Sequence, residues 1–374
     1  MMKSYTKAVV AVLFLSLTGA LFAEGYDTPI KPFTLPSARI HGYGGPHAAY
    51  TDDINTLFVN PAALRTAKQI SVLDLAFGTT GDVIGLGKVA TDMLKSDDDL
   101  DYTTIGEFAE KTGGKLPLGV SAPGLALGYV GHGFGFGLFS REYVDAEVVG
   151  MNVKAAANID VVLNGGYSFR LINTETHILD VGVAAKVFGR YGLERADNFL
   201  NIADHADAIL EEVMDGATTY IGGGLDLGTT YTLGKFKAAL VYNDVFSPAA
   251  VKRTTGDTWG VVESKMNIGL SYQVFGGKSI KLAAMADYRD IFNLFKQKDY
   301  RSRNPWLNLG IGVEAEFFNI ISVQVGMNDM LPAAGIGFDL FIFEFVASIY
   351  GKELGNDPGV LSTYGLDAGI LFRY

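Results

Sequence analysis

The residues of this chain that could do chemistry are scattered, and none stands at the spacing that a familiar reaction requires. The sequence has no cysteine, which excludes a disulfide framework, a thiolate metal site and a cysteine nucleophile. Its five histidines lack the spacing of metal ligands, and they are His41, His47, His132, His177 and His205. We therefore predict no metal site and no catalytic histidine.

Two short motifs resemble ligand sites without completing them. The segment Gly276–Ser279 reads like the end of a phosphate-binding loop, but Tyr272 stands where the leading glycine is needed, and a hairpin is expected in place of the helix. The acidic run Asp97–Asp101 could hold a hard cation, yet it lacks the spaced ligands of a calcium loop. A tight turn and a solvated loop explain these motifs, so we predict no enzymatic activity and no cofactor.

The last eleven residues alternate in character as a membrane strand does. Apolar residues fall on one face of a strand, and glycines and charged residues fall mainly on the other. The apolar face consists of Tyr364, Leu366, Ala368, Ile370, Phe372 and Tyr374. Such a strand suits a wall between lipid and a wet lumen, although a half-buried strand of a soluble sandwich remains an alternative. We expect Phe372 and Tyr374 to form a signal that the outer-membrane assembly machinery recognises.

The first residues predict export. Lys3 and Lys7 precede an apolar run over residues 8–20, and Ala23 is a small residue before a cleavage point. We predict a signal peptide over residues 1–23, with Ala20 as a second possible cleavage site. No other segment approaches the roughly 20 uninterrupted apolar residues of a membrane-spanning helix. A membrane protein without such helices must be a closed barrel, because lipid leaves backbone groups unsatisfied.

Period-two runs bounded by turn residues predict fourteen strands. They lie near residues 67–78, 120–130, 133–144, 157–170, 176–189, 220–233, 235–246, 264–275, 278–289, 306–317, 319–328, 334–341, 343–351 and 361–374. Tight turns follow the even strands and longer connections follow the odd ones, which is the asymmetry of outer-membrane barrels. We predict an all-β fold: a 14-stranded antiparallel transmembrane barrel over residues 67–374, preceded by a separate segment over residues 24–66.

The predicted strands separate their two faces clearly. Between residues 178 and 190, Asp180, Lys186 and Arg190 fall opposite Val183 and Val187. The polar face should line the lumen. There Glu314 and Glu316 would be balanced by cationic side chains, for which we expect Lys186, Lys281 and Arg289.

The two longest predicted connections, residues 79–119 and 190–219, contain helical periodicity. The second stripe runs between Glu194 and Asp215, and the first runs between Val83 and Leu94. These stripes could pack on each other as a lid or line a hydrophobic groove, and we favour the groove. Its candidate residues are Val89, Met93, Phe199, Ile202, Ile209, Leu210 and Val213.

Residues 51–64, which precede the first predicted strand, contain the sequence Asn60-Pro61-Ala62. Asparagine before proline favours a turn or a helix start. In this position the segment resembles the Asn-Pro-Ala motif of the long-chain fatty acid transporter (FadL) family and its PorV-like relatives. The resemblance implies a fourteen-stranded barrel that is plugged by an N-terminal hatch, and it implies that residues 24–66 form this hatch.

The third predicted strand and the turn before it carry four alternate glycines, Gly131, Gly133, Gly135 and Gly137. A strand face without side chains lets a ligand or another backbone approach closely. In the family that the chain resembles, the third strand bends inward and opens a lateral gap for the substrate. These glycines are therefore candidates for a lateral opening, and room for the hatch to pack is the alternative.

The sequence thus predicts a passive transporter in the outer membrane of a diderm bacterium. Its expected partners are the lipid bilayer, the assembly machinery and a hydrophobic small molecule, with long-chain fatty acids first. The formal net charge of −11 argues against binding nucleic acid. The alternative is a PorV-like scaffold that docks secreted or surface proteins. An open diffusion porin is disfavoured because residues 24–66 are long enough to plug the lumen. The chain is shorter than the fatty acid transporters and has no obvious basic cluster for a carboxylate headgroup.

Overall fold

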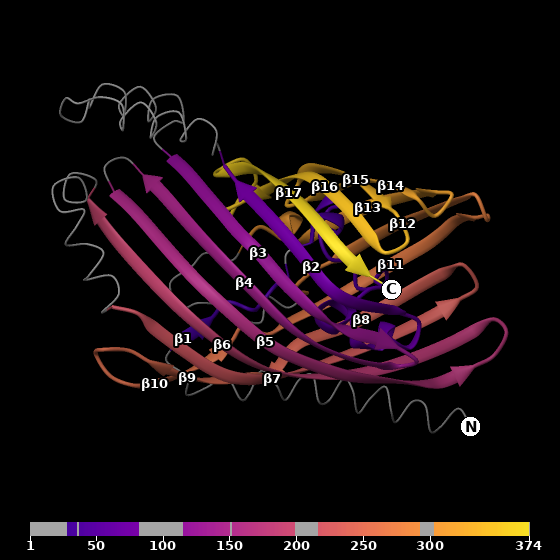
Figure 1. Cartoon of the computed structure of the whole chain (residues 1–374), viewed down its shortest axis with the longest axis horizontal. Coiled ribbons are helices and arrows are strands. Elements are labelled where there is room, and N and C mark those ends of the chain that lie inside the picture. The colour runs from indigo at the N-terminus through magenta and orange to yellow at the C-terminus, as the bar shows by residue number, and fades with distance from the viewer. Residues whose placement is uncertain are drawn as a thin grey trace.

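The computed structural model of the chain describes residues 28–35, 37–81, 115–149, 152–198, 216–291 and 303–373. Fourteen antiparallel strands in this part of the chain close into a barrel (Figure 1). The barrel strands are β2 (Gln69–Thr80), β3 (Lys115–Gly131), β4 (Phe134–Val149), β5 (Asn152–Asn173), β6 (His177–Asn198), β7 (Thr218–Leu233), β8 (Phe236–Phe246), β11 (Lys265–Gly276), β12 (Ile280–Tyr288), β13 (Leu309–Phe317), β14 (Ile321–Asn328), β15 (Leu331–Asp339), β16 (Phe343–Glu353) and β17 (Ser362–Arg373). The predicted fold class is confirmed.

The barrel closes because the first and last of these strands pair. The β17–β2 ladder runs from Gly365 opposite Thr80 to Arg373 opposite Ser71. The two ends of the barrel sequence therefore meet at the same rim as the tight turns, as an even number of strands requires. We call this rim the turn end and the opposite rim the loop end.

Three further short strands widen the wall at the loop end. The strand β9 (Pro248–Lys252) pairs with β7, and β10 (Thr258–Val262) pairs with β9. The N-terminal strand β1 (Thr28–Ile30) then adds to β10 in parallel. The chain thus begins its described path as part of the wall before it enters the lumen.

The structure corrects three details of the predicted loops. The strands β4 and β5 continue until Val149 pairs with Asn152, so residues 145–156 are mostly strand and not a longer connection. The strand β6 likewise continues to Asn198, which pairs with Asn152. Residues 194–198 were predicted to begin a helical stripe and are instead extended, because the edge of β5 offers them backbone partners. The connection between β14 and β15 is also tight, with Asp329 and Met330 at positive φ.

The barrel wall is much taller on one side than on the other (Figure 1). The strands β5 and β6 each have 22 residues. On the opposite side, β13 and β15 have nine residues and β14 has eight. Long strands of this kind exceed the ~9–11 residues that cross a membrane, so β5 and β6 project beyond the bilayer.

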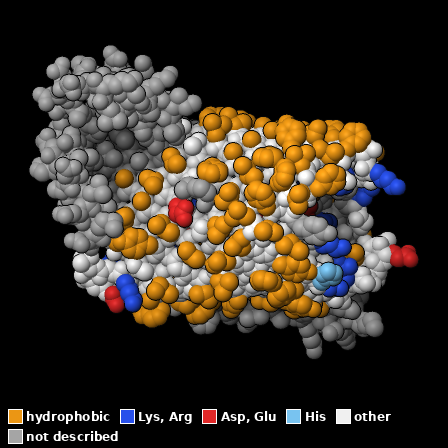
Figure 2. Space-filling model, in the orientation of Figure 1, with side chains coloured by type: hydrophobic (Ala, Val, Ile, Leu, Met, Phe, Trp, Pro, Cys, Tyr) orange, Lys and Arg blue, Asp and Glu red, His pale blue; other side chains and the backbone are white. Residues whose placement is uncertain are grey.

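The outer surface of the barrel is apolar, whereas the inner face is polar. Figure 2 shows hydrophobic side chains covering the visible wall, with few charged side chains between its two ends. On β6, Val187 is 61% exposed while Lys186 is buried. On β17, Leu366 is 54% exposed while Asp367 is only 7% exposed. This reversal of ordinary burial places lipid outside the barrel, so the chain forms an outer-membrane barrel. No helix in the described ranges is long and apolar enough to cross a membrane.

Candidate functional site: the lumen and the segment inside it

Residues 37–67 fold inside the barrel, and we call them the inner segment. It contains the helices α2 (Ala38–Gly42) and α3 (Thr56–Val59) and the 3-10 helix η2 (Pro61–Arg65). The helix α2 is capped by Ser37, whose hydroxyl accepts a hydrogen bond from the Ile40 backbone N–H. The segment contacts the inner faces of all fourteen barrel strands. It therefore fills the cross-section of the barrel.

The motif Asn60-Pro61-Ala62 forms the start of η2. Asn60 is fully buried and caps this helix, because its side-chain oxygen accepts from the Ala62 backbone N–H at 2.9 Å. Its side-chain nitrogen donates to the Ala48 carbonyl at 2.7 Å and to the Thr230 hydroxyl of β7 at 2.9 Å. One residue thus holds the helix start, a second stretch of the inner segment and the wall together.

Polar side chains of the wall bond the backbone of the inner segment, whose short helices leave many carbonyls unpaired. The acceptors are carbonyl oxygens, and the donors come from four different positions on the wall. The bonds are Asn164 to Leu57, Ser168 to Ala62, Asn243 to Phe58 and Ser271 to Ala49, with lengths of 2.8 to 3.0 Å. These bonds satisfy backbone groups that have no access to water.

Asp287 of β12 anchors the middle of the inner segment. One carboxylate oxygen accepts from the Ala48 backbone N–H at 2.7 Å, and the other lies 2.5 Å from Nδ1 of His47. The remaining ring nitrogen of His47 lies 3.0 Å from the Tyr43 carbonyl. Because that carbonyl can only accept, this nitrogen of His47 carries a proton. A second histidine, His41, pairs with Asp367 of β17.

An ion pair joins the inner segment to β13. The Arg39 guanidinium donates to both carboxylate oxygens of Glu314, from Nε at 2.9 Å and from Nη2 at 2.8 Å. The Tyr50 hydroxyl also donates to Glu314 at 2.7 Å. Burial raises the pKa of the Tyr50 hydroxyl well above its ordinary value, with a further contribution from the negative charge of Glu314. Tyr50 therefore stays a donor, and the two-pronged Arg39 pair gives the contact a defined geometry.

Of the cationic side chains expected to balance Glu314 and Glu316, only one does so. Lys281 pairs with Glu316 at 3.1 Å, as predicted. Lys186 does not meet either glutamate, since it binds Asp226 at 3.0 Å and Asp244 at 2.8 Å. Arg289 lies beside two glycines, Gly45 and Gly310, at the far end of β12.

Wall glycines let the backbone of the inner segment approach the sheet directly. A methyl group at Gly182 of β6 would overlap the carbonyl of Pro61, and one at Gly228 of β7 would overlap the side chain of Asn60. A methyl group at Gly312 or Gly326 would overlap the Tyr43 carbonyl in the same way. The absence of side chains at these four glycines leaves the space in which the backbone of the inner segment packs.

Between the inner segment and the wall of β3 to β6 runs an apolar seam. The rings of Phe33 and Phe58 lie 5.2 Å apart, and Phe58 meets Phe139 of β4 edge to face at 4.7 Å. Val162 and Phe188 continue the same cluster along β5 and β6. At the loop end, Phe188 also packs on a second cluster that contains Ile30, Val251 and Val262. Phe188 thus joins the two apolar clusters from the loop end to the middle of the lumen. The charged side chains of Asp160, Lys186, Arg190 and Asp244 line a small cavity beside it.

The opposite side of the lumen is charged. A cavity of about 350 Å³ opens there at the turn end, between the inner segment and the strands β12 to β17. It is lined by the Arg39–Glu314 and Lys281–Glu316 pairs and by other polar residues, including Asp52, Asp53, Lys68, Gln69, Glu344 and Arg373. The apolar residues Ile320, Ile321, Phe341 and Phe343 also line it. A hydrophobic molecule would have to displace water from these charges to pass this way.

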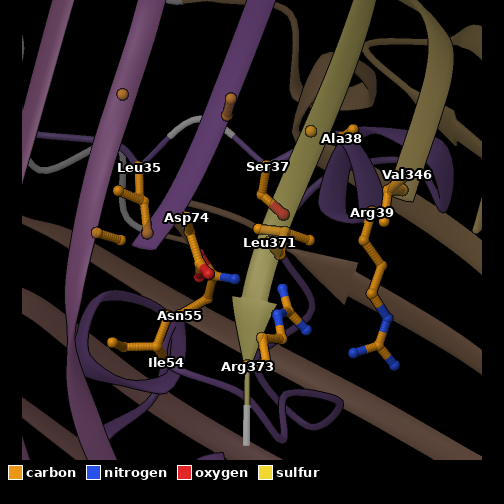
Figure 3. A pocket seen from close by; sticks show the side chains of 14 residues that line it. Leu35, Ser37, Ala38, Arg39, Ile54, Asn55, Asp74, Val346, Leu371 and Arg373 are labelled. Atoms are coloured by element: carbon orange, nitrogen blue, oxygen red, sulfur yellow. The ribbon is translucent and has the colours of Figure 1, made fainter. Parts of the chain in front are cut away.

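A smaller cavity of about 20 Å³ lies between the inner segment and the strands β2, β3, β16 and β17 (Figure 3). The labelled side chains of Leu35 and Ile54 lie on one side of it, and Asn55 and Asp74 point toward each other there. Gly124 and Ala126 form its wall on β3. Its other lining residues include Val346 of β16, Leu371 and Arg373 of β17 and Arg39 of the inner segment. The cavity therefore lies behind the sheet where β2 joins β3 and β17, and two arginines line it.

The ladders on both sides of β3 are interrupted at the same place. Toward β2, Ser121 pairs with Gly78 and Gly124 pairs with Ala76, so two residues of β3 face one of β2. Toward β4, the register shifts again between Ser121 and Leu125. The intervening segment contains Pro123, which has no backbone N–H to contribute. This is a weak point in the wall.

The predicted lateral-opening glycines lie in an intact part of the sheet. The ladders of β4 with β3 and β5 are continuous over Gly135 and Gly137. Gly135 faces Leu64 and Leu57 of the inner segment, and Gly131 and Gly133 lie at the adjoining turn. The packing of the inner segment against them matches the alternative reading, and an opening at these glycines stays a prediction.

The other predicted sites are placed only in part. Phe372 lies on the outer face of β17, and its ring lies 6.2 Å from that of Phe343. Tyr374, the seven groove residues (Val89, Met93, Phe199, Ile202, Ile209, Leu210 and Val213) and the signal peptide lie outside the described residues. Within the described ranges, no three side chains of histidine, cysteine, aspartate or glutamate come close enough to hold a metal ion.

Sequence reasoning missed most residues that bond the inner segment. Asn164, Ser168 and Asn243 are polar residues on otherwise apolar or glycine-rich strands, and this contrast was the available signal. Nothing in the sequence pairs Arg39 with Glu314, because the two residues are 275 positions apart.

No protein-family model matches this chain, and no curated protein sequence matches it. Several solved structures do. The toluene transporter TodX of Pseudomonas putida shares 13% identity, with 92% of this chain and 99% of that chain covered and a TM-score of 0.47. A FadL homologue of Pseudomonas aeruginosa shares 12% identity, with 93% and 99% covered and a TM-score of 0.45. The translocator domain of the autotransporter NalP from Neisseria meningitidis shares 9% identity, with 82% and 88% covered and a TM-score of 0.34. FadL-type proteins, which residues 51–64 resemble, are thus among the solved structures that are similar to this chain.

Proposed function

We propose that this protein admits small hydrophobic molecules passively across the outer membrane, with long-chain fatty acids as the first candidates. The observation that carries the proposal is the apolar seam along β3 to β6, which ends near the interruption in β3. In this proposal the inner segment acts as the hatch. The apolar stripes expected at Val89, Met93, Phe199, Ile202, Ile209, Leu210 and Val213 would capture the molecule from water.

The two sides of the lumen favour different solutes. An acyl chain gains about 0.8 kcal/mol for each methylene that leaves water, and the seam between Phe58 and Phe139 offers that environment. The charged cavity at the turn end offers the reverse, because its ion pairs would lose water without gaining a partner. A hydrophobic molecule should therefore follow the seam and avoid the charged exit.

The proposed exit is sideways, through β3 between Ser121 and Leu125. Both neighbouring ladders are already interrupted there, so fewer backbone hydrogen bonds must break than elsewhere in the wall. The lipid-facing side of β4 supports the assignment. Its positions alternate through the exposed Leu138 and Val144, and Glu142 shares that face. A carboxylate in a lipid-facing belt is destabilising and commonly marks a functional position.

Passage requires Phe58 of the inner segment and Phe33, which precedes that segment, to move, because their rings now fill the seam. The segment is held by discrete polar bonds and by the apolar packing of Ile54, Leu57 and Leu64 against β3 to β5. A hydrophobic molecule that replaces Phe33 against Phe58 would keep the seam dry while the segment shifts. Movement can thus be coupled to binding without exposing the seam to water.

The test compares added bulk on the two sides of the lumen. Ala126 lines the smaller cavity behind the sheet, and Ser322 lines the charged cavity. We expect Ala126→Phe to reduce uptake of radiolabelled oleate or toluene into cells that carry this barrel as their hydrophobic channel. The matched variant Ser322→Phe should leave uptake unchanged. Equal uptake by wild type and Ala126→Phe, with both barrels assembled, would contradict the proposed route.

The alternative function, a scaffold that docks secreted or surface proteins, makes a different prediction. A scaffold needs no hydrophobic ligand, so mass spectrometry of the protein purified in mild detergent should find none in the barrel. Bound fatty acid or another apolar molecule that survives purification favours the transporter. Absence of any ligand, together with no uptake, favours the scaffold.

A further inference from the structure

Two neighbouring turns at the turn end are apolar, unlike the others. The turn between β13 and β14 contains Phe318 and Ile320, and the turn between β15 and β16 contains Leu340, Phe341 and Ile342. All five side chains are exposed, and Phe341 is 91% exposed. Ile320 and Phe341 also line the charged cavity at the turn end, whereas Phe318, Leu340 and Ile342 do not. The remaining turns at this end are built from polar residues and glycine, at residues 132–133, 174–176, 234–235 and 277–279.

The backbone of these two turns makes the choice of phenylalanine unusual. Phe318 has a φ of 56° and Phe341 has a φ of 67°, in the left-handed region that favours glycine or asparagine. The β7–β8 turn places Gly234 at positive φ, and the β3–β4 turn places His132 and Gly133 there. Bulky aromatic residues are therefore kept at two strained positions where glycine would be easier, which points to a use for their side chains.

The two turns form one unit on the barrel rim. The Asp339 backbone N–H donates to the Ile320 carbonyl at 2.7 Å, which ties the second turn to the first. The Phe341 backbone N–H donates to the Asp339 carboxylate at 3.0 Å. The lipid-facing residues Phe338 and Phe345 lead directly into the second turn. The apolar rim is thus continuous with the belt that faces lipid.

Strand length explains why the apolar rim lies on this side. The strands β13 to β15 have only eight or nine residues, at or below the ~9–11 residues that a tilted strand needs to cross the hydrocarbon core. The tall side of the barrel, with β5 and β6, needs no such extension, and its turn is polar. The short side must use its turns to complete the belt.

The loop end of the short strands cannot supply the missing height. Arg303 pairs with Asp329 there at 2.8 Å. The carboxylate of Glu353 accepts backbone N–H groups of the β16–β17 connection, from Gly355, Gly359 and Leu361, at 2.7 to 2.8 Å. This charged network belongs in water, so the opposite end of the same strands must sit deeper.

We propose that the two turns, Phe318–Ile320 and Leu340–Ile342, insert into the acyl region of the adjacent bilayer leaflet. The partner of this surface is phospholipid. Insertion lets the bilayer remain in contact with apolar surface around a barrel of uneven height. Burial of the two phenylalanine rings in lipid also offsets the backbone strain at their positions.

The experiment places a tryptophan at the rim and measures contact with lipid. The two native tryptophans, Trp259 and Trp306, are first replaced by phenylalanine, since both are exposed. The full chain with Phe341→Trp is reconstituted into phosphatidylcholine vesicles whose acyl chains are brominated. We expect bromine to quench most of the fluorescence of this tryptophan and its emission to shift to the blue.

The control is Thr174→Trp in the polar turn between β5 and β6, which should emit as a water-exposed tryptophan and resist quenching. Phe318→Trp provides a second reporter on the neighbouring turn should Phe341→Trp not assemble, as judged by heat-modifiable migration. Quenching at Phe341 or Phe318 that does not exceed that at Thr174 overturns the proposal. A blue shift without quenching also overturns it, because the ring would then be covered by protein and not by lipid.

Discussion

Replacing Asn60 with alanine should make the inner segment separate from the barrel wall more often while leaving the barrel folded. The side chain makes three hydrogen bonds at 2.7 to 2.9 Å and is fully buried. Loss of the helix cap costs about 1 kcal/mol. The bonds to Ala48 and Thr230 each contribute about 1 kcal/mol, since their partners would stay buried without a donor. The total of about 3 kcal/mol corresponds to a roughly 100-fold change in an equilibrium constant.

Hydrogen exchange measured by mass spectrometry reports this equilibrium directly. Amides of residues 48–66 exchange only when the segment opens, provided that opening is smaller than global unfolding. We expect exchange in Asn60→Ala to be roughly 100-fold faster in this stretch and unchanged in β5 and β6. The matched variant Thr230→Val removes one of the three bonds at nearly constant volume and should accelerate exchange only about fivefold, which corresponds to about 1 kcal/mol.

Two results would refute this reasoning. If residues 48–66 exchange equally in Asn60→Ala and wild type, the three bonds do not hold the segment. If the β5 and β6 amides accelerate as much as the segment does, Asn60 stabilises the whole barrel, and the segment is not a separately movable unit.

Three further predictions follow from the wall and its ends. Gly182→Val should prevent seating of the inner segment by steric overlap and raise single-channel conductance in planar bilayers; a conductance equal to wild type would show that the wall adapts. The double variant Phe372→Ala with Tyr374→Ala should lower the yield of heat-modifiable barrel, and a normal yield would remove these residues as an assembly signal. A cysteine at Asp257 should be labelled by a membrane-impermeant reagent from outside intact cells, whereas one at Asn173 should be protected; the reverse pattern would invert the orientation.

The sequence determined the wall of the barrel. Alternation along each strand is a local property, because successive side chains point to opposite faces whatever the partner strand is. It predicted that Val187 faces lipid and Lys186 faces the lumen, and the structure confirms both. The helix start at Asn60 is equally local, since the cap bonds a backbone group two residues away.

Strand ends were harder to predict, because they depend on whether a neighbour offers backbone partners. Residues 194–198 have a helical stripe, yet the edge of β5 makes them a strand. The interruption of β3 could not be located either, although Pro123 hinted at it. A break in a ladder is a property of register between two strands, and register is set by the closure of all fourteen.

The interior of the barrel was decided only by tertiary structure. Arg39 finds Glu314, and His47 finds Asp287, across separations of 275 and 240 residues that no periodicity encodes. The apolar and charged sides of the lumen also depend on tertiary structure. Each side is formed by the inner faces of several strands together with part of residues 37–67. The sequence by itself determines which side chains point inward; which of them meet is set by barrel closure and by the path of residues 37–67 through the lumen.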